Sequence, residues 1–162
     1  MNIAGIIHES LNDGNGIRTV IFISGCKHNC KNCQNKRLFN FNYGKSFDED
    51  MQNYIINYIK TDPLLDGVTL SGGDPAYSEK ELIPFVKRIK TECSNKDIWM
   101  YTGFTFEDIK DKEVLKYVDI LVDGLFVESK LDRTLKFKGS SNQRIINVQE
   151  SLKQGKVILW EN

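Results

Sequence analysis

Short apolar runs alternate with longer amphipathic segments along most of the chain. Residues 18–24 are rich in Val, Ile, Thr and Phe and are followed by Gly25, which predicts a strand leading into a loop. A single apolar stripe with helical spacing comes next, at Met51, Tyr54, Ile55, Tyr58 and Ile59. Pro63 is expected to end this helix.

The same alternation continues towards the C-terminus. Short strands are predicted at 68–70, 98–101, 120–122 and 157–160. A second helix carries one apolar face, formed by Leu82, Phe85, Val86 and Ile89. Ser78 and Glu81 have the spacing of a capping box at its start, although Pro84 then falls inside the helix, where a kink is expected. A third helical stretch is predicted from 105 to 118.

This order of strands and helices indicates an α/β fold. Strands that alternate with helices form a parallel sheet with right-handed crossovers. With 162 residues, the chain has the size of one domain, and we expect residues 1–162 to form a single one. Four or five strand–helix units are too few for a complete barrel of eight. We therefore predict an incomplete, TIM-like barrel of about five to six parallel strands.

Four strand ends carry the chemically distinctive residues. A cysteine loop begins after Gly25, and the other strands end at Gly72-Gly73-Asp74, Thr102-Gly103 and Asp123-Gly124. Ligands of parallel sheets bind at the carboxyl ends of the strands. All four segments should therefore face one mouth.

The composition narrows the class of partner. Lys and Arg together number 22, as do Asp and Glu, so the net charge favours neither nucleic acid nor a membrane as a partner. No apolar run approaches the roughly 20 residues that a membrane span needs. The N-terminus carries His8 and Glu9 instead of a basic stretch before an apolar core, so no secretion signal is expected. We expect a cytoplasmic protein.

Three of the four cysteines, Cys26, Cys30 and Cys33, lie within eight residues at C-x3-C-x2-C spacing. Thiols in a reducing compartment bind metal more often than they form disulfides. Three thiolates on one loop can each reach a different iron of a cubic cluster, whereas clusters that only carry electrons usually have four cysteine ligands. The triple therefore predicts a [4Fe–4S] cluster with one open iron, at which a substrate can bind directly.

Two alternatives remain for the cysteine triple. It could hold zinc, with His28, His8 or Cys93 as the fourth ligand, but structural zinc motifs typically come as two paired knuckles. A thiol redox role or a purely structural role is the other alternative. We expect His28 to point outward from the loop and Cys93 to be a small buried hydrophobe.

The cysteine loop is also basic. Its positive side chains are Lys27, Lys31, Lys36 and Arg37, and no acidic residue lies between Cys26 and Arg37. These charges could balance a negative cluster or guide an acidic partner surface. A solvated loop without either role is the alternative.

Several motifs resemble a known family. The cysteine triple after the first predicted strand resembles the radical S-adenosylmethionine superfamily. Residues 13–18 (Asp-Gly-Asn-Gly-Ile-Arg) and Gln34-Asn35 resemble the glycyl-radical activating enzymes within it. The stretches 97–103, 121–124 and 138–144 narrow the resemblance to the activating proteins of anaerobic ribonucleotide reductase.

The resemblance implies two cofactors, one [4Fe–4S] cluster on the three cysteines and S-adenosylmethionine. Gly72-Gly73-Asp74 is similar to the Gly-Gly-Glu turn that receives the methionine amino group. Asn32 stands where many relatives carry an aromatic residue beside the adenine, so only its backbone contact is carried over. The expected contacts of S-adenosylmethionine are Asn32, Gly72, Gly73, Asp74, Thr102 and Asp123. For Asp123, a structural role in holding its turn is the alternative.

The resemblance further implies a radical enzyme that reductively cleaves S-adenosylmethionine and generates a glycyl radical on the large subunit of anaerobic ribonucleotide reductase. A reductant such as flavodoxin would supply the electron, and no catalytic side chain beyond the cluster ligands is expected. The chain could be a monomer or a homodimer. The alternatives are an activase of pyruvate formate-lyase, a radical enzyme of a small molecule such as a deazapurine synthase, and a metal-binding interaction module.

Overall fold

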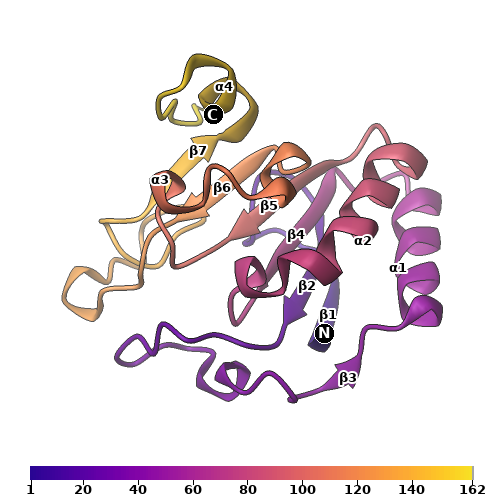
Figure 1. The fold of residues 1–162 in the computed structure, drawn as a ribbon, viewed down its shortest axis with the longest axis horizontal. Helices are drawn as coiled ribbons and strands as arrows, with labels where there is room; N and C mark the ends of the chain where they lie inside the picture. The colour runs from indigo at the N-terminus through magenta and orange to yellow at the C-terminus, as the bar shows by residue number, and fades with distance from the viewer. Residues whose placement is uncertain (162) are drawn as a thin grey trace.

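The computed structural model describes residues 1–161 and contains one seven-stranded mixed sheet (Figure 1). The strand order is β3-β1-β2-β4-β5-β6-β7. The bounds are β1 Asn2–Ser10, β2 Arg18–Ile23, β3 Lys45–Ser46, β4 Gly67–Gly72, β5 Asp97–Tyr101, β6 Ile120–Asp123 and β7 Arg144–Asn147. The longer helices are α1 Glu49–Thr61 and α2 Glu79–Glu92, and the shorter ones are α3 Phe106–Ile109 and α4 Val148–Gln154.

The centre of the sheet is parallel and its margins are antiparallel. Strands β2, β4, β5 and β6 pair in parallel, whereas β1 pairs antiparallel with β2 and β3, and β7 pairs antiparallel with β6. The prediction of an α/β fold is confirmed, but the prediction of five to six parallel strands is wrong, because only four are parallel. The sheet is open, with β3 and β7 at its edges.

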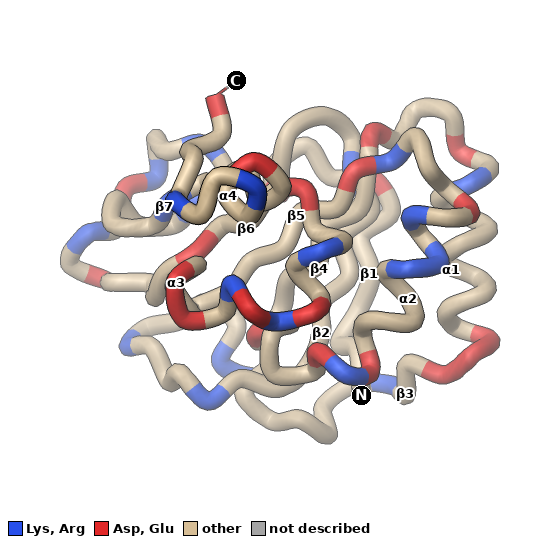
Figure 2. Tube along the Cα trace, turned by 45° about the horizontal axis from the view of Figure 1, so that its top comes forward, with Lys and Arg blue, Asp and Glu red and all other residues tan. Residues whose placement is uncertain are grey.

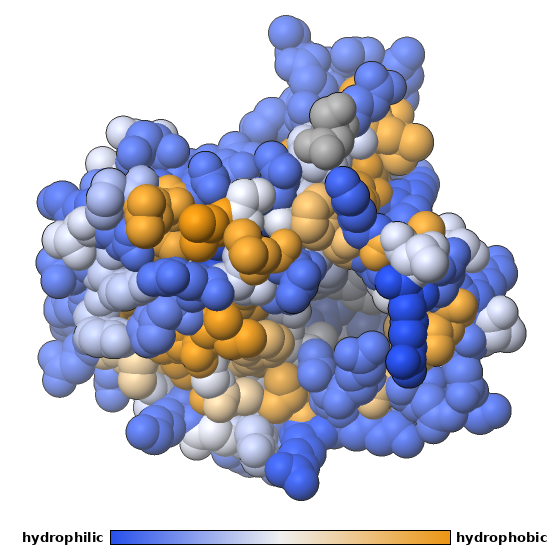
Figure 3. Space-filling view, turned by 180° about the vertical axis from the view of Figure 1, so that it is seen from behind, coloured by the Kyte–Doolittle hydropathy of each residue, from blue (hydrophilic) through white to orange (hydrophobic). Residues whose placement is uncertain are grey.

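Two cores lie on opposite faces of the sheet because successive strand residues point to opposite sides. Ile98, Met100 and Leu121 face the larger core, which also takes the apolar sides of α1 and α2. Trp99 and Val122 face the smaller core, against side chains from the segment after β6 and from the C-terminal end. The face opposite the long helices is therefore covered by irregular segments, and Figure 3 shows it hollowed beside them.

Three local predictions differ from the structure. Residues 158–160 make an isolated bridge and backbone hydrogen bonds to β7 but form no strand. The stretch 105–118 is interrupted, with α3 followed by a short 3₁₀ turn, η3 Glu113–Lys116. Ser78 lies at the N-cap of α2 but makes no capping bond with its side chain, and the helix continues through Pro84. No helix in residues 1–161 is long and apolar enough to cross a membrane.

Candidate functional site

The cysteine loop begins where β2 ends, and left-handed turns fold it back on itself. Gly25 has a φ of 106°, and Asn29 and Asn32 have φ values of 53° and 55°. Such values suit glycine and are tolerated by asparagine. The backbone N–H of Gly25 donates to the carbonyl of Leu38 over 2.7 Å, which closes the loop at its base.

All three loop cysteines, Cys26, Cys30 and Cys33, line one cavity of about 160 Å³. They are free thiols of intermediate exposure. Burial raises the pKa of the Cys26 thiol to about 11 and raises that of Cys30 as well. Cys26 and Cys30 are therefore protonated at neutral pH without a metal, and metal binding has to release a proton from each of these two thiols.

The other zinc ligands considered from the sequence are placed elsewhere. Cys93 is buried in the larger core, as expected, and His8 packs against Tyr54 and Tyr58. Within residues 1–161, no three His, Cys, Asp or Glu side chains are grouped as ligands of a single metal ion. Cysteines that bind separate irons of a cluster lie farther apart than ligands of one ion. A donor set of three thiols around one cavity fits the cluster.

The four strand ends meet at this cavity. Besides the cysteines, the lining includes Gly72 and Gly73 at the end of β4, Thr102 and Gly103 after β5, and Gly124 after β6. The expectation that these segments face one mouth is confirmed. Two larger cavities adjoin it through shared lining residues, one of about 540 Å³ and one of about 710 Å³.

Two glycines are required at the end of β4 for different reasons. Gly72 has a φ of 113°, a conformation that side chains rarely adopt. A Cβ on Gly73 would lie 2.5 Å from the carbonyl oxygen of Gly25 and 2.7 Å from that of Leu38. The cysteine loop therefore packs directly on the backbone of Gly73.

Asp74 is 1% exposed, and both of its carboxylate oxygens are already bonded. Oδ2 accepts from the Thr102 hydroxyl and from the Gly103 N–H, each over 2.9 Å, and contacts His28 Nε2 at 2.7 Å. Oδ1 accepts from the Ala76 N–H at the start of the 3₁₀ turn η2, Pro75–Ser78. Asp74 therefore joins the cysteine loop, the β4 turn and the end of β5.

The prediction that His28 points outward is wrong. Its side chain is 13% exposed and lies against Asp74 and Phe104. The chemical cause is the buried carboxylate, which needs hydrogen-bond donors. The alternation of residue types along the loop gives no sign of this contact, because the carboxylate comes from a strand end 46 residues away.

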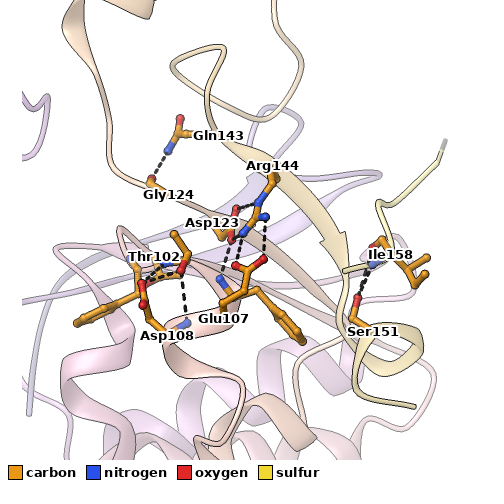
Figure 4. Close-up of polar contacts among 12 residues, drawn as sticks. Thr102, Glu107, Asp108, Asp123, Gly124, Gln143, Arg144, Ser151 and Ile158 are labelled. Atoms are coloured by element: carbon orange, nitrogen blue, oxygen red, sulfur yellow. Dashed lines mark hydrogen bonds and ion pairs between the residues drawn. The ribbon is translucent and has the colours of Figure 1, made fainter. Parts of the chain in front are cut away.

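Asp123 is equally buried and is held by Arg144 (Figure 4). Arg144 donates from Nε to Oδ1 over 3.0 Å and from Nη2 to Oδ2 over 2.5 Å, and Oδ2 also accepts from the Phe106 N–H. The same guanidinium makes two bonds to Glu107, and these lower the pKa of Glu107 to about 2. This network lines the cavity of about 710 Å³ and fixes the start of α3 to β7.

Asn32 and the segment from 138 to 144 form parts of the rim. The Asn32 amide donates to the carboxylate of Glu128, so its side chain bridges the cysteine loop to the 3₁₀ turn η4, Glu128–Lys130. Gln143 accepts from the N–H groups of Gly139 and Ser140 and donates to the Gly124 carbonyl over 3.0 Å. Gln143 also lines two of the cavities, so this loop both closes on itself and borders the site.

Sequence reasoning missed several lining residues. Phe126 and Tyr101 border the cysteine cavity, and Phe22 and Phe137 line the adjoining cavity of about 540 Å³. The two strand residues, Phe22 and Tyr101, could have been found from the alternation of strand faces, because they point away from the helix-covered side. Phe126 and Phe137 lie in an irregular segment without any periodic signal.

Comparison with known proteins gives a consistent match. Residues 12–146 match the family described as a 4Fe-4S single cluster domain. The anaerobic ribonucleoside-triphosphate reductase-activating protein of Haemophilus influenzae is 41% identical over 138 residues, which cover 82% of this chain and 89% of that protein. The protein of the same name from Pasteurella multocida is 40% identical, covering 90% and 96%.

Proteins of the same name from another bacterium and from a virus are also similar to this chain. The protein of this name from Escherichia coli K12 is 38% identical over 81% of this chain and 88% of its own length. That of enterobacteria phage T4 is also 38% identical, over 82% of this chain and 85% of its own length. The matched residues 12–146 of this chain span the cysteine loop and the strand ends described above. The chain belongs to the family of anaerobic ribonucleoside-triphosphate reductase-activating proteins.

Proposed function

We propose that this protein activates an anaerobic ribonucleoside-triphosphate reductase by generating a glycyl radical on it, through reductive cleavage of S-adenosylmethionine. One observation carries the proposal most strongly. Three free thiols and the ends of four parallel strands surround a single cavity in a chain whose relatives are named as activators of that reductase.

Cys26, Cys30 and Cys33 would hold three irons of a [4Fe–4S] cluster and leave the fourth open. When bound, the cluster supplies one electron that breaks a carbon–sulfur bond of S-adenosylmethionine. The protein has to provide three thiolates, a place for the sulfonium compound beside the open iron, and exclusion of other hydrogen donors. The glycine-lined cavity next to the thiols has the backbone groups for such a place.

S-adenosylmethionine would be received by the backbone of Gly72 and Gly73, by Thr102 and by the Asn32 backbone. Small residues at a strand end allow close approach of a ligand to carbonyl and amide groups. Direct contacts of Asp74 and Asp123 with the ligand stay predictions. Both carboxylates are 1% exposed and bonded to neighbouring segments, so their geometry supports a role in holding the cavity wall.

The adjoining cavity of about 540 Å³ would admit the glycine segment of the reductase. It lies between the cysteine loop and the segment after β6, and its walls include Phe22, Phe126 and Phe137. Aromatic walls exclude solvent molecules and solutes that could donate hydrogen to a radical. We propose that the open sheet acts here as a partial barrel, whose hollowed side opposite the long helices lets the partner approach (Figure 3).

The reductase and a protein reductant such as flavodoxin are the proposed partners. Both have to reach the mouth, which is bordered by two basic segments, 26–39 and 126–143. Their basic side chains are Lys27, Lys31, Lys36, Arg37, Lys130, Arg133, Lys136 and Lys138, and their acidic ones are Glu128 and Asp132 (Figure 2). This local excess of positive charge would guide an acidic partner surface. A single domain, a cytoplasmic location and a monomer or homodimer stay parts of the proposal.

Electron paramagnetic resonance tests the function directly. The protein is reconstituted with iron and sulfide without oxygen, then mixed with the candidate reductase, dithionite and S-adenosylmethionine. A glycyl radical doublet that requires all components is expected. Cleavage of S-adenosylmethionine without any radical on the reductase would contradict the proposal and would favour a small-molecule enzyme or an activase of pyruvate formate-lyase instead.

A further inference from the structure

We propose that His28 is a positioning residue that ties the cysteine loop to the wall that receives S-adenosylmethionine. The inference rests on the proposed function of that cavity. His28 lies between two of the proposed cluster ligands and contacts the end of β4 and the segment after β5. It therefore connects the part of the protein that would hold the cluster with the part that would hold the cosubstrate.

The connection runs through Asp74. The Thr102 hydroxyl and the Gly103 N–H both donate to Asp74 Oδ2, and His28 Nε2 lies 2.7 Å from the same atom. A carboxylate oxygen accepts hydrogen bonds, so Nε2 carries the hydrogen of this contact. Two segments of the chain, the cysteine loop and the end of β5, thus bond to one buried oxygen of a third segment.

The His28 ring is also packed on several sides. Its centroid lies 4.5 Å from that of Phe104 in an edge-on arrangement and 5.3 Å from that of Tyr77. A Cβ on Gly103 would lie 2.5 Å from His28 Cδ2, so the glycine leaves the space that the ring occupies. The imidazole thus has one bonded position and little room for another.

Elsewhere the cysteine loop is held by Lys31 and Asn32, which both contact the Glu128 carboxylate. Within the described part of the chain, His28 alone makes a side-chain hydrogen bond between Cys26 and Cys30. The backbone N–H groups of residues 27–32 make no backbone bond, since the nearest ones come from Cys26 and Cys33. Loss of the His28 bond would remove the side-chain hydrogen bond of this turn and leave the buried carboxylate one donor short.

Substitution by residues of similar length separates the hydrogen bond from packing. Gln can donate from Nε2 to Asp74, whereas Met has a comparable shape without a donor. His28→Phe keeps the ring and removes the donor. The other histidine of the chain, His8, lies against Tyr54 and Tyr58 and is not among the residues lining the cavities, so His8→Gln is the matched control.

The first measurement uses metal-free protein and the rate at which iodoacetamide alkylates each cysteine, read by peptide mass spectrometry. We expect Cys26 and Cys30 to react about tenfold faster in His28→Met and His28→Phe, which corresponds to one lost charge-assisted hydrogen bond. In His28→Gln and His8→Gln, the alkylation rates of Cys26 and Cys30 should stay within about twofold of the native rates, because both variants keep a donor to Asp74. Cys93 is the internal reference, because it reacts quickly only if the whole fold opens.

The second measurement uses the iron-loaded protein. His28→Met should raise the KM for S-adenosylmethionine about tenfold while iron content stays near the native value and kcat changes less, and His28→Gln should restore the KM. Equal alkylation rates and equal KM values in Gln and Met variants would overturn the inference. If the native protein holds no iron or cleaves no S-adenosylmethionine, the proposed function fails, but the alkylation result still decides whether His28 holds the loop.

Discussion

At the scale of single residues, burial decides what a functional group does. Asp74 and Asp123 follow strands, as expected for groups that contact a ligand, yet each is 1% exposed and bonded to protein donors. Sequence places these carboxylates at the correct edge of the sheet. The sequence does not show which residues bond to these carboxylates, because His28 and Arg144 belong to segments that lie far away along the chain.

Arg144 is predicted to stabilise the protein because it pairs with the buried carboxylate of Asp123. Among the described residues, Arg144→Met would leave that buried carboxylate with one donor, the Phe106 N–H. We expect the free energy of unfolding to fall by about 2–4 kcal/mol, measured by urea denaturation.

Arg88 provides a control of matched exposure. Arg88 and Arg144 side chains are 32% and 33% exposed, but the Glu92 partner of Arg88 is 37% exposed. Arg88→Met should cost less than about 1 kcal/mol, since exposed pairs contribute little. Equal losses for the two variants would show that the buried carboxylate is not the cause.

The three loop cysteines are predicted to be the cluster ligands. Cys30→Ala should abolish binding of iron and the brown colour after anaerobic reconstitution, since only two thiolates remain. Cys93→Ala should keep both, because Cys93 lies in the core. Iron and sulfide analysis measures the difference, and a fully loaded Cys30→Ala protein would refute the assignment of ligands.

At the scale of elements, periodicity identified the central strands and the two long helices. Strands β2, β4, β5 and β6 are short β-branched or aromatic runs, and α1 and α2 have clear apolar stripes. Strand β1 was missed because Ala4 and Gly5 interrupt its apolar pattern. Strand β7 was missed because only two of its four residues are apolar, Ile145 and Ile146, and its pairing with β6 depends on long-range contacts.

The cysteine loop packs closely on the end of β4. We therefore predict that one added methyl group at this contact displaces the loop. A Cβ at position 73 would overlap two backbone carbonyls, so Gly73→Ala has to push the loop away from the strand end. We expect the variant to retain less than about half of the native iron after gel filtration, because a displaced loop cannot keep all three thiolates in place.

Gly5→Ala is the matched control for this element. A Cβ on Gly5 would have open space around it, with no neighbouring segment within 4 Å, and the φ of Gly5 is not positive. The Gly5→Ala variant should bind as much iron as the native protein. Normal iron retention in Gly73→Ala would show that the loop position is not fixed by this contact.

At the scale of the whole molecule, a chain with no net charge has a basic mouth. The eight basic residues on the two bordering segments are balanced by acidic residues elsewhere, including those on α1 and α3 (Figure 2). Composition alone cannot show this separation, since it depends on which segments the fold places together. The open sheet leaves the basic side accessible.

Ionic strength is predicted to control the encounter with the reductase. With dithionite as reductant, the initial rate of glycyl radical formation at limiting protein should fall several-fold between about 0.05 and 0.3 M salt, because exposed charges are screened. Lys130→Glu with Lys136→Glu should lower the rate at low salt and weaken its salt dependence. Lys60→Glu with Lys80→Glu, on α1 and α2, is the control, and equal effects of both pairs would contradict docking at the mouth.

The account depends on a cluster with one open iron beside the glycine-lined cavity. The most direct measurement is the electron paramagnetic resonance spectrum of the dithionite-reduced protein, recorded with and without S-adenosylmethionine after anaerobic reconstitution. We predict about four irons per chain and a reduced-cluster signal that changes when S-adenosylmethionine binds. A colourless protein with one zinc ion, or a cluster signal that S-adenosylmethionine leaves unchanged, would contradict the account.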